Sequence, residues 1–209
     1  MTEPQAAQKT EHRDFLNKYY GASRWFYDVT RKYYLFGRDR VLEQLSQQSW
    51  HTLVEIGPGT GRNLRKIQAS KSNILLGGVE ASDAMLEYAK KRVPGIHWKQ
   101  GFAEDTDYTS LLGRRPDRVL FSYCLSMVQE REAAIERARE SLSPRGEVVI
   151  VDFADLSGLP KPFGPALRKW LEAFHVQPLD HDFLAQFTDN IEYGPGRYFV
   201  IARIPALVE

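Results

Sequence analysis

Short apolar runs alternate with amphipathic stretches through the middle of the chain. The run LVEIG at 53–57 is too short for a typical helix and ends in a glycine-rich stretch, which is typical of a strand buried in a parallel sheet. The same order, an apolar run followed by an amphipathic stretch, recurs as far as residue 153. The pattern predicts strands at 53–57, 74–80, 96–100, 118–123 and 147–153, and helices at 62–69, 82–92, 108–112 and 130–142.

The C-terminal part departs from this alternation. Two β-type runs, 191–193 and 197–204, flank Gly194-Pro195-Gly196, which is a hairpin signal. Segment 155–165 has the composition of an irregular loop after the fifth strand, at the edge of the sheet where open α/β folds bind ligands. Together the runs predict an α/β fold with a doubly wound, mostly parallel seven-stranded sheet and a C-terminal antiparallel hairpin.

The N-terminal segment has a different character. Residues 14–45 read as helix, rich in aromatic and basic side chains and divided at Gly21 and Gly37. A chain of 209 residues fits one domain. We therefore expect residues 46–209 to form the core of a single domain and residues 1–45 to form a helical cap over its active site.

Composition excludes several classes of function. Lys and Arg total 28 against 27 for Asp and Glu, so no overall positive charge attracts nucleic acid, and the N/D-P-P-Y/F/W motif of amino-methylating nucleic-acid enzymes is missing. Cys124 is the only cysteine, which fits a small buried residue better than a nucleophile. The five histidines are scattered, so we expect no metal. A polar N-terminus and the lack of a long apolar run predict a cytoplasmic protein, with peripheral contact at the inner membrane face left open.

A glycine turn follows the first predicted strand. Gly57, Gly59 and Gly61 let the backbone turn sharply and approach a ligand closely, while the next helix directs free N–H groups at it. The dinucleotide fingerprint would need Gly or Ala where this chain has Arg62. Glu55, at the end of the strand, would repel a diphosphate but suits a ligand that carries an ammonium and a sulfonium.

A second carboxylate, Glu80, stands at the end of the second strand, where it can accept hydrogen bonds from both hydroxyls of a ribose. With this pair of signals, the sequence EIGPGTG at 55–61 resembles the first motif of class I S-adenosylmethionine-dependent methyltransferases, and the resemblance extends from 53 to 204. It implies the Rossmann-like methyltransferase fold, S-adenosylmethionine as cofactor and S-adenosylhomocysteine as product. The hairpin at 191–204 is similar to the last two strands of that family.

The resemblance also assigns parts of the cofactor to parts of the chain. It implies that Glu55 and the turn hold the methionine part, Glu80 the ribose, and the segment 101–105 the adenine. Phe102 departs from the family pattern, since many members have an acidic residue there. The residues expected to bind the cofactor are Glu55, Gly57, Pro58, Gly59, Thr60, Gly61, Asn63, Glu80, Ala81, Met85, Gly101, Phe102, Ala103, Glu104, Ser122 and Tyr123.

Three residues are candidates for a catalytic role at the acceptor. Tyr123 ends the fourth strand and Tyr27 belongs to the aromatic N-terminal segment; such rings could surround an amine, although aromatic residues at helical spacing more often pack on a core. His175 could position or deprotonate the amine, with a helix-end histidine bonded to a backbone carbonyl as the alternative. The basic residues Arg31, Lys32, Arg38 and Arg40 could anchor an anionic group or simply form a solvated helix face.

A narrower resemblance concerns the acceptor. The segments YDVTRKYYLFGRDR at 27–40 and LRKWLEAFHVQP at 167–178 look like those of the diacylglyceryl-homoserine N-methyltransferases of bacterial betaine-lipid synthesis. This implies a role in lipid metabolism, with up to three methyl groups added to a lipid-linked amine and with Trp25, Phe26 and Leu35 or Phe36 inserted in a membrane surface. The alternatives are phosphatidylethanolamine, a quinone ring or another small molecule as acceptor, or an inactive cofactor-binding partner subunit.

Overall fold

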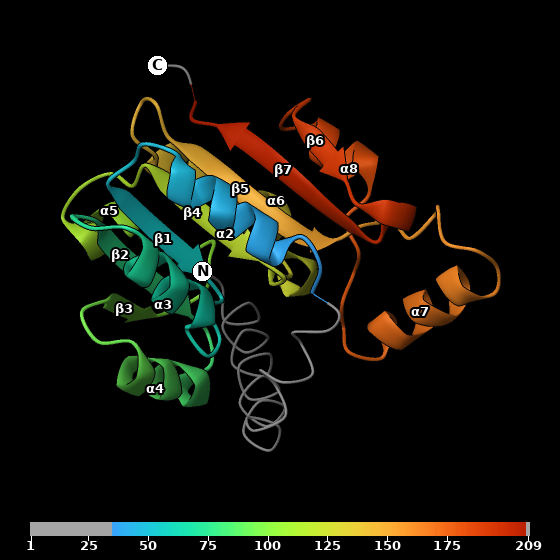
Figure 1. Ribbon diagram of the computed structural model, residues 1–209, viewed down its shortest axis with the longest axis horizontal. Coiled ribbons are helices and arrows are strands. Elements are labelled where there is room, and N and C mark those ends of the chain that lie inside the picture. The colour runs from blue at the N-terminus through green and yellow to red at the C-terminus, as the bar shows by residue number, and fades with distance from the viewer. Residues whose placement is uncertain (1–34, 208–209) are drawn as a thin grey trace, which may run out of the picture.

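The computed structural model describes residues 35–207, which form a seven-stranded sheet with helices on both faces (Figure 1). The strand order is β3-β2-β1-β4-β5-β7-β6; the first five are parallel, and β7 runs antiparallel to both β5 and β6. This confirms the predicted fold class. The strands are β1 Thr52–Ile56, β2 Leu75–Glu80, β3 His97–Gln100, β4 Arg118–Ser122, β5 Glu147–Phe153, β6 Ile191–Tyr193 and β7 Phe199–Pro205.

Two apolar layers hold helices against the two faces of this sheet. One layer is formed with α2, α3 and the end of α4, and includes the buried residues Leu45, Leu64 and Val93; the other is formed with α5, α6 and α8. Strands β1, β4 and β5 are buried on both sides, as expected of central parallel strands. The helices are α2 Arg38–Gln47, α3 Arg62–Ser70, α4 Asp83–Arg92, α5 Tyr108–Leu112, α6 Arg131–Ser141, α7 Phe163–Glu172 and α8 His181–Ala185, with 3₁₀ turns η1 Leu125–Met127 and η2 Pro195–Arg197.

Helix starts follow local capping chemistry. Ser82 caps α4, and its hydroxyl accepts a hydrogen bond from the Met85 N–H at 3.4 Å. Asp107 and Asp180 cap α5 and α8 in the same way. These polar side chains satisfy backbone donors that the first turn of a helix leaves without a partner.

Most predicted elements are confirmed within one or two residues, and the differences lie after β5. The expected loop at 155–165 already turns into helix at Phe163, because Pro165 lies in the first turn, where a missing N–H removes no helical hydrogen bond. The last strand begins at Phe199 rather than at 197, since Gly196 and Arg197 both adopt positive φ in the turn. Helix α8 was not predicted.

The described part of the expected cap, residues 35–45, packs on the sheet. Val41 and Leu45 of α2 are fully buried, and the Trp50 indole donates to the Leu45 carbonyl at 2.7 Å. Helix α2 therefore belongs to the same helical layer as α3, whereas residues 1–34 lie outside the described part of the chain.

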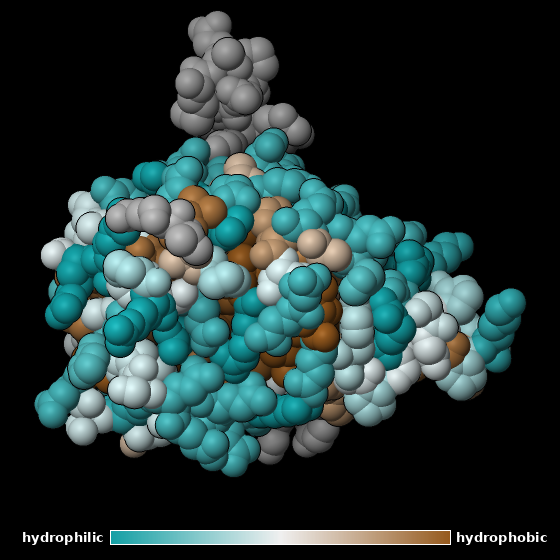
Figure 2. All heavy atoms as spheres, turned by 90° about the horizontal axis from the view of Figure 1, so that it is seen from above, coloured by the Kyte–Doolittle hydropathy of each residue, from teal (hydrophilic) through white to brown (hydrophobic). Residues whose placement is uncertain are grey.

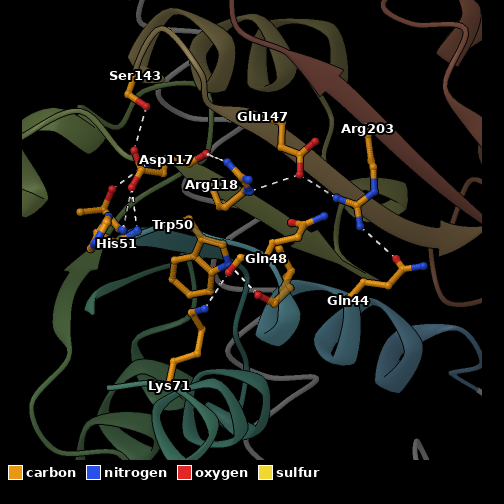
Figure 3. A network of polar contacts seen from close by, with 12 residues as sticks. Gln44, Gln48, Trp50, His51, Lys71, Asp117, Arg118, Ser143, Glu147 and Arg203 are labelled. Atoms are coloured by element: carbon orange, nitrogen blue, oxygen red, sulfur yellow. Dashed lines mark hydrogen bonds and ion pairs between the residues drawn. The ribbon is translucent and has the colours of Figure 1, made fainter. Parts of the chain in front are cut away.

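A polar network closes the edge of the sheet where the parallel strands begin (Figure 3). Asp117 accepts hydrogen bonds from the backbone N–H groups of His51 and Thr52, while Glu147 pairs with Arg118 at 3.1 Å and with Arg203 at 2.7 Å. Because these contacts occupy the amino ends of the strands, the carboxyl ends at the opposite edge are left for a ligand.

The face of the molecule seen from above is mainly hydrophilic (Figure 2). Seen from above, it shows mostly teal residues with small hydrophobic areas in the middle (Figure 2). Among the described helices, none is long and apolar enough to cross a bilayer.

Candidate cofactor and acceptor site

A tight turn joins β1 to α3 at the carboxyl edge of the sheet. Gly57, Gly59 and Gly61 have φ values of 60°, 56° and 73°, in the left-handed region that favours glycine. The Gly57 N–H donates to the Val79 carbonyl at 2.8 Å, and a Cβ on Gly57 would lie 2.8 Å from the Cβ of Cys124. The turn therefore brings bare backbone to the strand ends, as the sequence predicted.

Glu80 shapes this turn from the neighbouring strand. Its Oε2 accepts the Gly59 N–H and its Oε1 accepts the Ser82 N–H, both at 3.0 Å, and the residue is only 6% exposed. A carboxylate has about four lone-pair positions, so each oxygen can accept a further hydrogen bond. Glu80 can thus fix the protein loop and still receive the hydroxyls of a ribose.

Glu55 is a buried carboxylate with one oxygen left for a ligand. Asn63 Nδ2 donates to Oε1 at 2.7 Å, whereas Oε2 is buried and accepts no hydrogen bond from the described residues. Burial raises the pKa of Glu55 to about 7, against the opposing effects of the Asn63 hydrogen bond and the positive charge of Arg38. A buried acceptor without a donor is costly, so this site fits a cationic donor from a ligand.

A small pocket opens between the glycine turn and the start of α2. The predicted residues Glu55, Gly57, Pro58, Gly59, Thr60, Asn63 and Ser122 line it, and so do three that the prediction did not place there, Leu35, Arg38 and Arg62. From the sequence, Arg38 is a candidate anchor for an anionic group, with a solvated helix face as the alternative. The sequence carries no local signal for Leu35 and Arg38, because they reach the turn through the packing of α2 on α3, where Arg62 donates to Asp39 at 3.0 Å. Arg62 lies there because it directly follows Gly61 in the chain.

The expected adenine-binding segment lies beside Glu80, at the ends of β2 and β3. The Gly101 N–H donates to the Glu80 carbonyl at 3.1 Å. The Phe102 carbonyl accepts the Thr106 hydroxyl at 2.8 Å and the Ala103 carbonyl accepts the Tyr108 hydroxyl at 2.5 Å, which fixes the loop. Three other residues predicted to bind the cofactor lie on this side of the site. Ala81 follows β2, half-buried Glu104 is in the loop after β3, and buried Met85 is in the first turn of α4.

Aromatic rings gather at the carboxyl ends of β4 and β5. The rings pack edge to face in a chain. The distance between ring centroids is 4.8 Å for Tyr123 and Phe153, 5.7 Å for Phe153 and Tyr198, and 5.3 Å for Tyr198 and Phe36. Tyr123 is buried, with a φ of 55°, and its hydroxyl donates to the Phe36 carbonyl. Burial raises the Tyr123 pKa, so in this arrangement the residue is a neutral donor that links β4 to the chain before α2.

Asp152 supports the loop that carries Tyr123, and the sequence analysis did not single it out. It is fully buried near the end of β5, where its carboxylate accepts the Ser126 N–H at 3.0 Å and the Phe153 N–H at 2.8 Å. Burial raises its pKa. Asp152 thereby holds the loop after β4 that carries Tyr123. A single charged residue inside the apolar run VVIVDF was the available signal.

The other two candidate catalytic residues are not brought to the turn by any element that the structure describes. Tyr27 lies outside the described residues. His175 is exposed and adopts a φ of 56° just after α7; its N–H donates to the Glu172 carbonyl, and the Val176 N–H donates to the Leu171 carbonyl. These bonds are those of a Schellman helix end, which explains the conformation of His175 without a catalytic role. Its catalytic role stays a prediction.

Metal-ligating chemistry is not assembled in residues 35–207, where the structure holds no cluster of three or more His, Cys, Asp or Glu suited to an ion. The Cys124 thiol donates to the Ile56 carbonyl at 3.0 Å, and burial raises its pKa. A protonated, hydrogen-bonded thiol packs the turn and is a poor nucleophile.

Comparisons with known proteins agree with this geometry. Residues 54–148 match the family described as "Methyltransferase domain". An uncharacterized methyltransferase of Oceanobacillus iheyensis is 31% identical over 116 residues, which is 54% of this chain and 52% of the relative. A demethylmenaquinone methyltransferase of Thermotoga maritima is 23% identical over 131 residues, 60% of this chain and 56% of the relative. The chain thus spans about half the length of these curated relatives.

A solved structure extends the likeness to nearly the whole fold. A protein of Thermotoga maritima, described as an S-adenosylmethionine-dependent methyltransferase and possible histamine N-methyltransferase, superposes with a TM-score of 0.65. It is 21% identical, and the match covers 93% of this chain and 97% of that one, so it supports the fold. Residues 54–148 are thus similar to a methyltransferase domain, and this segment contains the glycine turn and the two buried carboxylates beside it, Glu55 and Glu80.

Proposed function

We propose that this protein transfers the methyl group of S-adenosylmethionine to the amine of a lipid-linked acceptor of the diacylglyceryl-homoserine type, adding up to three methyl groups. Two neighbouring features carry the proposal. Glu55, which lines the pocket at the glycine turn, has a buried oxygen without a hydrogen-bond partner, and Phe36, Tyr123, Phe153 and Tyr198 form an aromatic cluster at the ends of the next strands. The first feature suits a cationic cofactor and the second suits a cationic product.

The residues present fit the cofactor. The positive sulfonium and ammonium of S-adenosylmethionine are favoured near buried Glu55, and Glu80 has acceptor capacity for ribose hydroxyls. Arg38, which lines the same pocket, can bind the carboxylate of the methionine part, because a guanidinium pairs with carboxylates through two parallel hydrogen bonds. When bound, the cofactor supplies a methyl group already activated by the adjacent sulfonium.

The aromatic cluster favours an amine acceptor. Each methylation of an amine leaves a bulkier cation, and a cation over an aromatic face gains about 0.5–2 kcal/mol. Tyr123, Phe153 and Tyr198 lie at the carboxyl ends of β4 and β5 or directly before β7, beside the strand that leads into the glycine turn. Edge-to-face packing holds these rings in place, so the aromatic surface that would contact the acceptor is preorganised.

The chemistry needs positioning more than a covalent intermediate. With the cofactor held by Glu55, Glu80 and Arg38, the amine lone pair would bond to the methyl carbon, and the electron pair of the broken carbon–sulfur bond would stay on sulfur. The acceptor nitrogen gives its proton to water before each attack, because only the neutral amine has the lone pair. An apolar pocket lowers the pKa of an amine and favours that neutral form.

Product analysis tests the proposal. Purified protein is incubated with S-adenosylmethionine and, separately, with diacylglyceryl-homoserine, phosphatidylethanolamine, histamine or a demethylated quinone, and the products are resolved by mass spectrometry. We expect mono-, di- and trimethylated diacylglyceryl-homoserine. Calorimetric titration with S-adenosylmethionine, with NAD as control, should show binding that Glu80→Gln weakens and that Glu87→Gln, an exposed carboxylate on α4, leaves unchanged.

Two results would overturn the proposal in different ways. If the protein binds the cofactor but methylates only the quinone, its function is ring methylation. This second candidate function is favoured by the similarity to a demethylmenaquinone methyltransferase. Cofactor binding without methyl transfer to any acceptor would favour an inactive partner subunit.

A further inference from the structure

Helix α7 presents a large apolar face to solvent. Phe163 is 70% exposed and Trp170 is 46% exposed, and among the residues of α7 only Gly164 and Leu171 are buried. Residues 163, 166, 170 and 173 are spaced three or four apart, so Phe163, Ala166, Trp170 and Ala173 lie on one side of the helix axis. The Trp170 and Phe174 ring centroids lie 4.8 Å apart, and Phe174 itself is half-buried against the core.

Such exposure is informative because the described fold buries or half-buries nearly all its other large apolar side chains. Phe163 and Trp170 are two of only four large hydrophobic residues that are exposed between residues 35 and 207. A contiguous exposed apolar face of this kind marks an interaction surface more often than a chance feature.

Positive charges flank the apolar face. Segment 161–174 contains Lys161, Arg168 and Lys169 against the single acidic residue Glu172, a balance of +3 and −1, or +2. Both lysines are exposed. Aromatic residues on one face with lysines beside them are typical of helices that lie in the head-group region of an anionic membrane. A second copy of this face would meet the same positive charges, which disfavours self-association through α7.

Helix α7 is fixed to the carboxyl edge of the sheet, where the glycine turn lies. Arg168 donates to the Asp155 carbonyl, and the Asp155 carboxylate pairs with Arg197 at 2.5 Å, so the base of α7 is tied to the turn before β7. The loop from β5 to α7 starts at the carboxyl end of β5, two positions from β1 in the strand order, or roughly 10 Å away. In Figure 1, α7 lies at the lower right, and its Leu171 is buried in the same apolar cluster as residues of α2 and α3.

We propose that α7 is a membrane-docking helix. Phe163 and Trp170 enter the head-group region of an anionic bilayer, and Lys161 and Lys169 contact its phosphates. The docking itself follows from α7 alone; only its use, to present a lipid-linked acceptor at the site, rests on the proposed function.

Vesicle co-sedimentation of the full-length protein tests the proposal. The probes are vesicles of phosphatidylcholine with phosphatidylglycerol and vesicles of phosphatidylcholine alone, each at low and high salt. We expect binding to the anionic vesicles at low salt. The double change Phe163→Ser with Trp170→Ser should reduce the partition coefficient roughly tenfold, since two large side chains lose their apolar burial, and Lys161→Glu with Lys169→Glu should reduce it similarly.

The matched control is Leu207→Ser. Leu207 is 43% exposed and follows β7, whose end pairs with the start of β5 at the opposite edge of the sheet, so its change should alter binding less than about twofold. Titration with S-adenosylmethionine verifies that each variant is folded and separates a failure of docking from a failure of the proposed function.

Three results would overturn membrane docking by α7. The first is wild-type protein that ignores anionic vesicles. The second is vesicle binding that survives the α7 changes but is lost in Trp25→Ser with Phe26→Ser, which would move the contact to the N-terminal segment. The third is a wild-type dimer in sedimentation velocity that the Phe163→Ser and Trp170→Ser changes dissociate, which would make a second copy the occupant of this face.

Discussion

The side-chain amide of Asn63 lies 2.7 Å from a carboxylate oxygen of Glu55 and donates to it. The same nitrogen lies 3.1 Å from the Ser122 hydroxyl. The first turn of α3 is thus linked to the ends of β1 and β4, and both Asn63 and Glu55 are buried, at 6% and 1% exposure. This bond keeps one oxygen of Glu55 occupied and leaves the other for a ligand.

Replacing Asn63 with alanine should destabilise the fold in a pH-dependent way. The change leaves a buried acceptor without its donor, which costs about 1–3 kcal/mol. Because the pKa of Glu55 is about 7, the loss should be larger at about pH 8.5, where the carboxylate is charged, than at about pH 5.5. Urea denaturation at both pH values measures it, with the exposed Asn190→Ala as control. Equal losses at both pH values would show that the charge of Glu55 is not involved.

Cofactor affinity should rise with pH as Glu55 ionises. Its pKa is raised from 4.5 to about 7 by burial, so the free protein holds a proton there below about pH 7 and must release it to offer a negative charge to the cofactor. Between about pH 5.5 and 7 we expect affinity to increase up to about tenfold per pH unit. Calorimetry in two buffers of different ionisation enthalpy should detect proton release. Glu55→Gln should bind weakly with a flat profile; a slope that persists in this variant would assign the proton elsewhere.

The same shift affects stability in the opposite direction. A carboxyl whose folded pKa lies above its unfolded value favours the folded state while protonated, and that contribution is lost as pH rises from about 4.5 to about 7. Glu55→Gln should therefore gain stability relative to the wild type across this interval, as measured by thermal unfolding.

Gly57→Ala should weaken cofactor binding more than Gly113→Ala, although both glycines have similar positive φ values. Gly57 and Gly113 have φ values of 60° and 69°, so alanine costs about 1–2 kcal/mol at either position. A Cβ at 57 would also lie 2.8 Å from the Cys124 Cβ, whereas a Cβ at Gly113 would meet nothing within 4 Å. We expect loss of cofactor binding only for Gly57→Ala. If Gly57→Ala with Cys124→Gly, which removes the Cys124 Cβ, restores binding, steric overlap is the cause.

The ion pair of Asp155 with Arg197 should support the fold down to strongly acidic pH. Hydrogen bonds from Arg197 lower the Asp155 pKa from 3.8 to about 2. A depressed carboxyl pKa gives stability that is present above the unfolded value and is lost as pH falls from about 4 to about 2. Asp155→Asn should therefore lose about 1–2 kcal/mol at neutral pH, after allowance for partial exposure, and nothing near pH 2.

Chemical unfolding at a series of pH values measures the Asp155 effect. Asp189→Asn, an exposed aspartate before β6, is the control and should show little change. A deficit of Asp155→Asn that stays constant down to pH 2 would mean that the carboxylate charge does not stabilise the loop.

Glu147→Gln should lower the free energy of unfolding more than Glu140→Gln, the same change at an exposed ion pair. Glu147 faces Arg118 and Arg203, whose side chains are only 11% and 14% exposed, so its removal leaves two partly buried cations without their anion (Figure 3). We expect a loss of about 2 kcal/mol in urea unfolding. Glu140→Gln, which removes an exposed pair with Arg137, should cost less than about 0.5 kcal/mol.

The sequence by itself determined the strand–helix order, the glycine turn and the carboxylates that end β1 and β2. These features have local signals: a short apolar run is a buried strand, glycine is needed where φ is positive, and Ser82 before an amphipathic run caps a helix. Each signal depends on residues close together in the chain, so the predicted positions agree with the structure within one or two residues.

Only the tertiary structure decided how the site is closed. Arg38 and Leu35 reach the pocket because α2 packs on α3, the Tyr123 hydroxyl binds the Phe36 carbonyl across 87 positions of sequence, and Asp152 holds the loop after β4. Such contacts depend on the distance between segments in space, which periodicity and composition do not encode. Helix α7 is the same kind of case: its pattern is amphipathic, but which face stays exposed was decided by how its buried side meets the sheet.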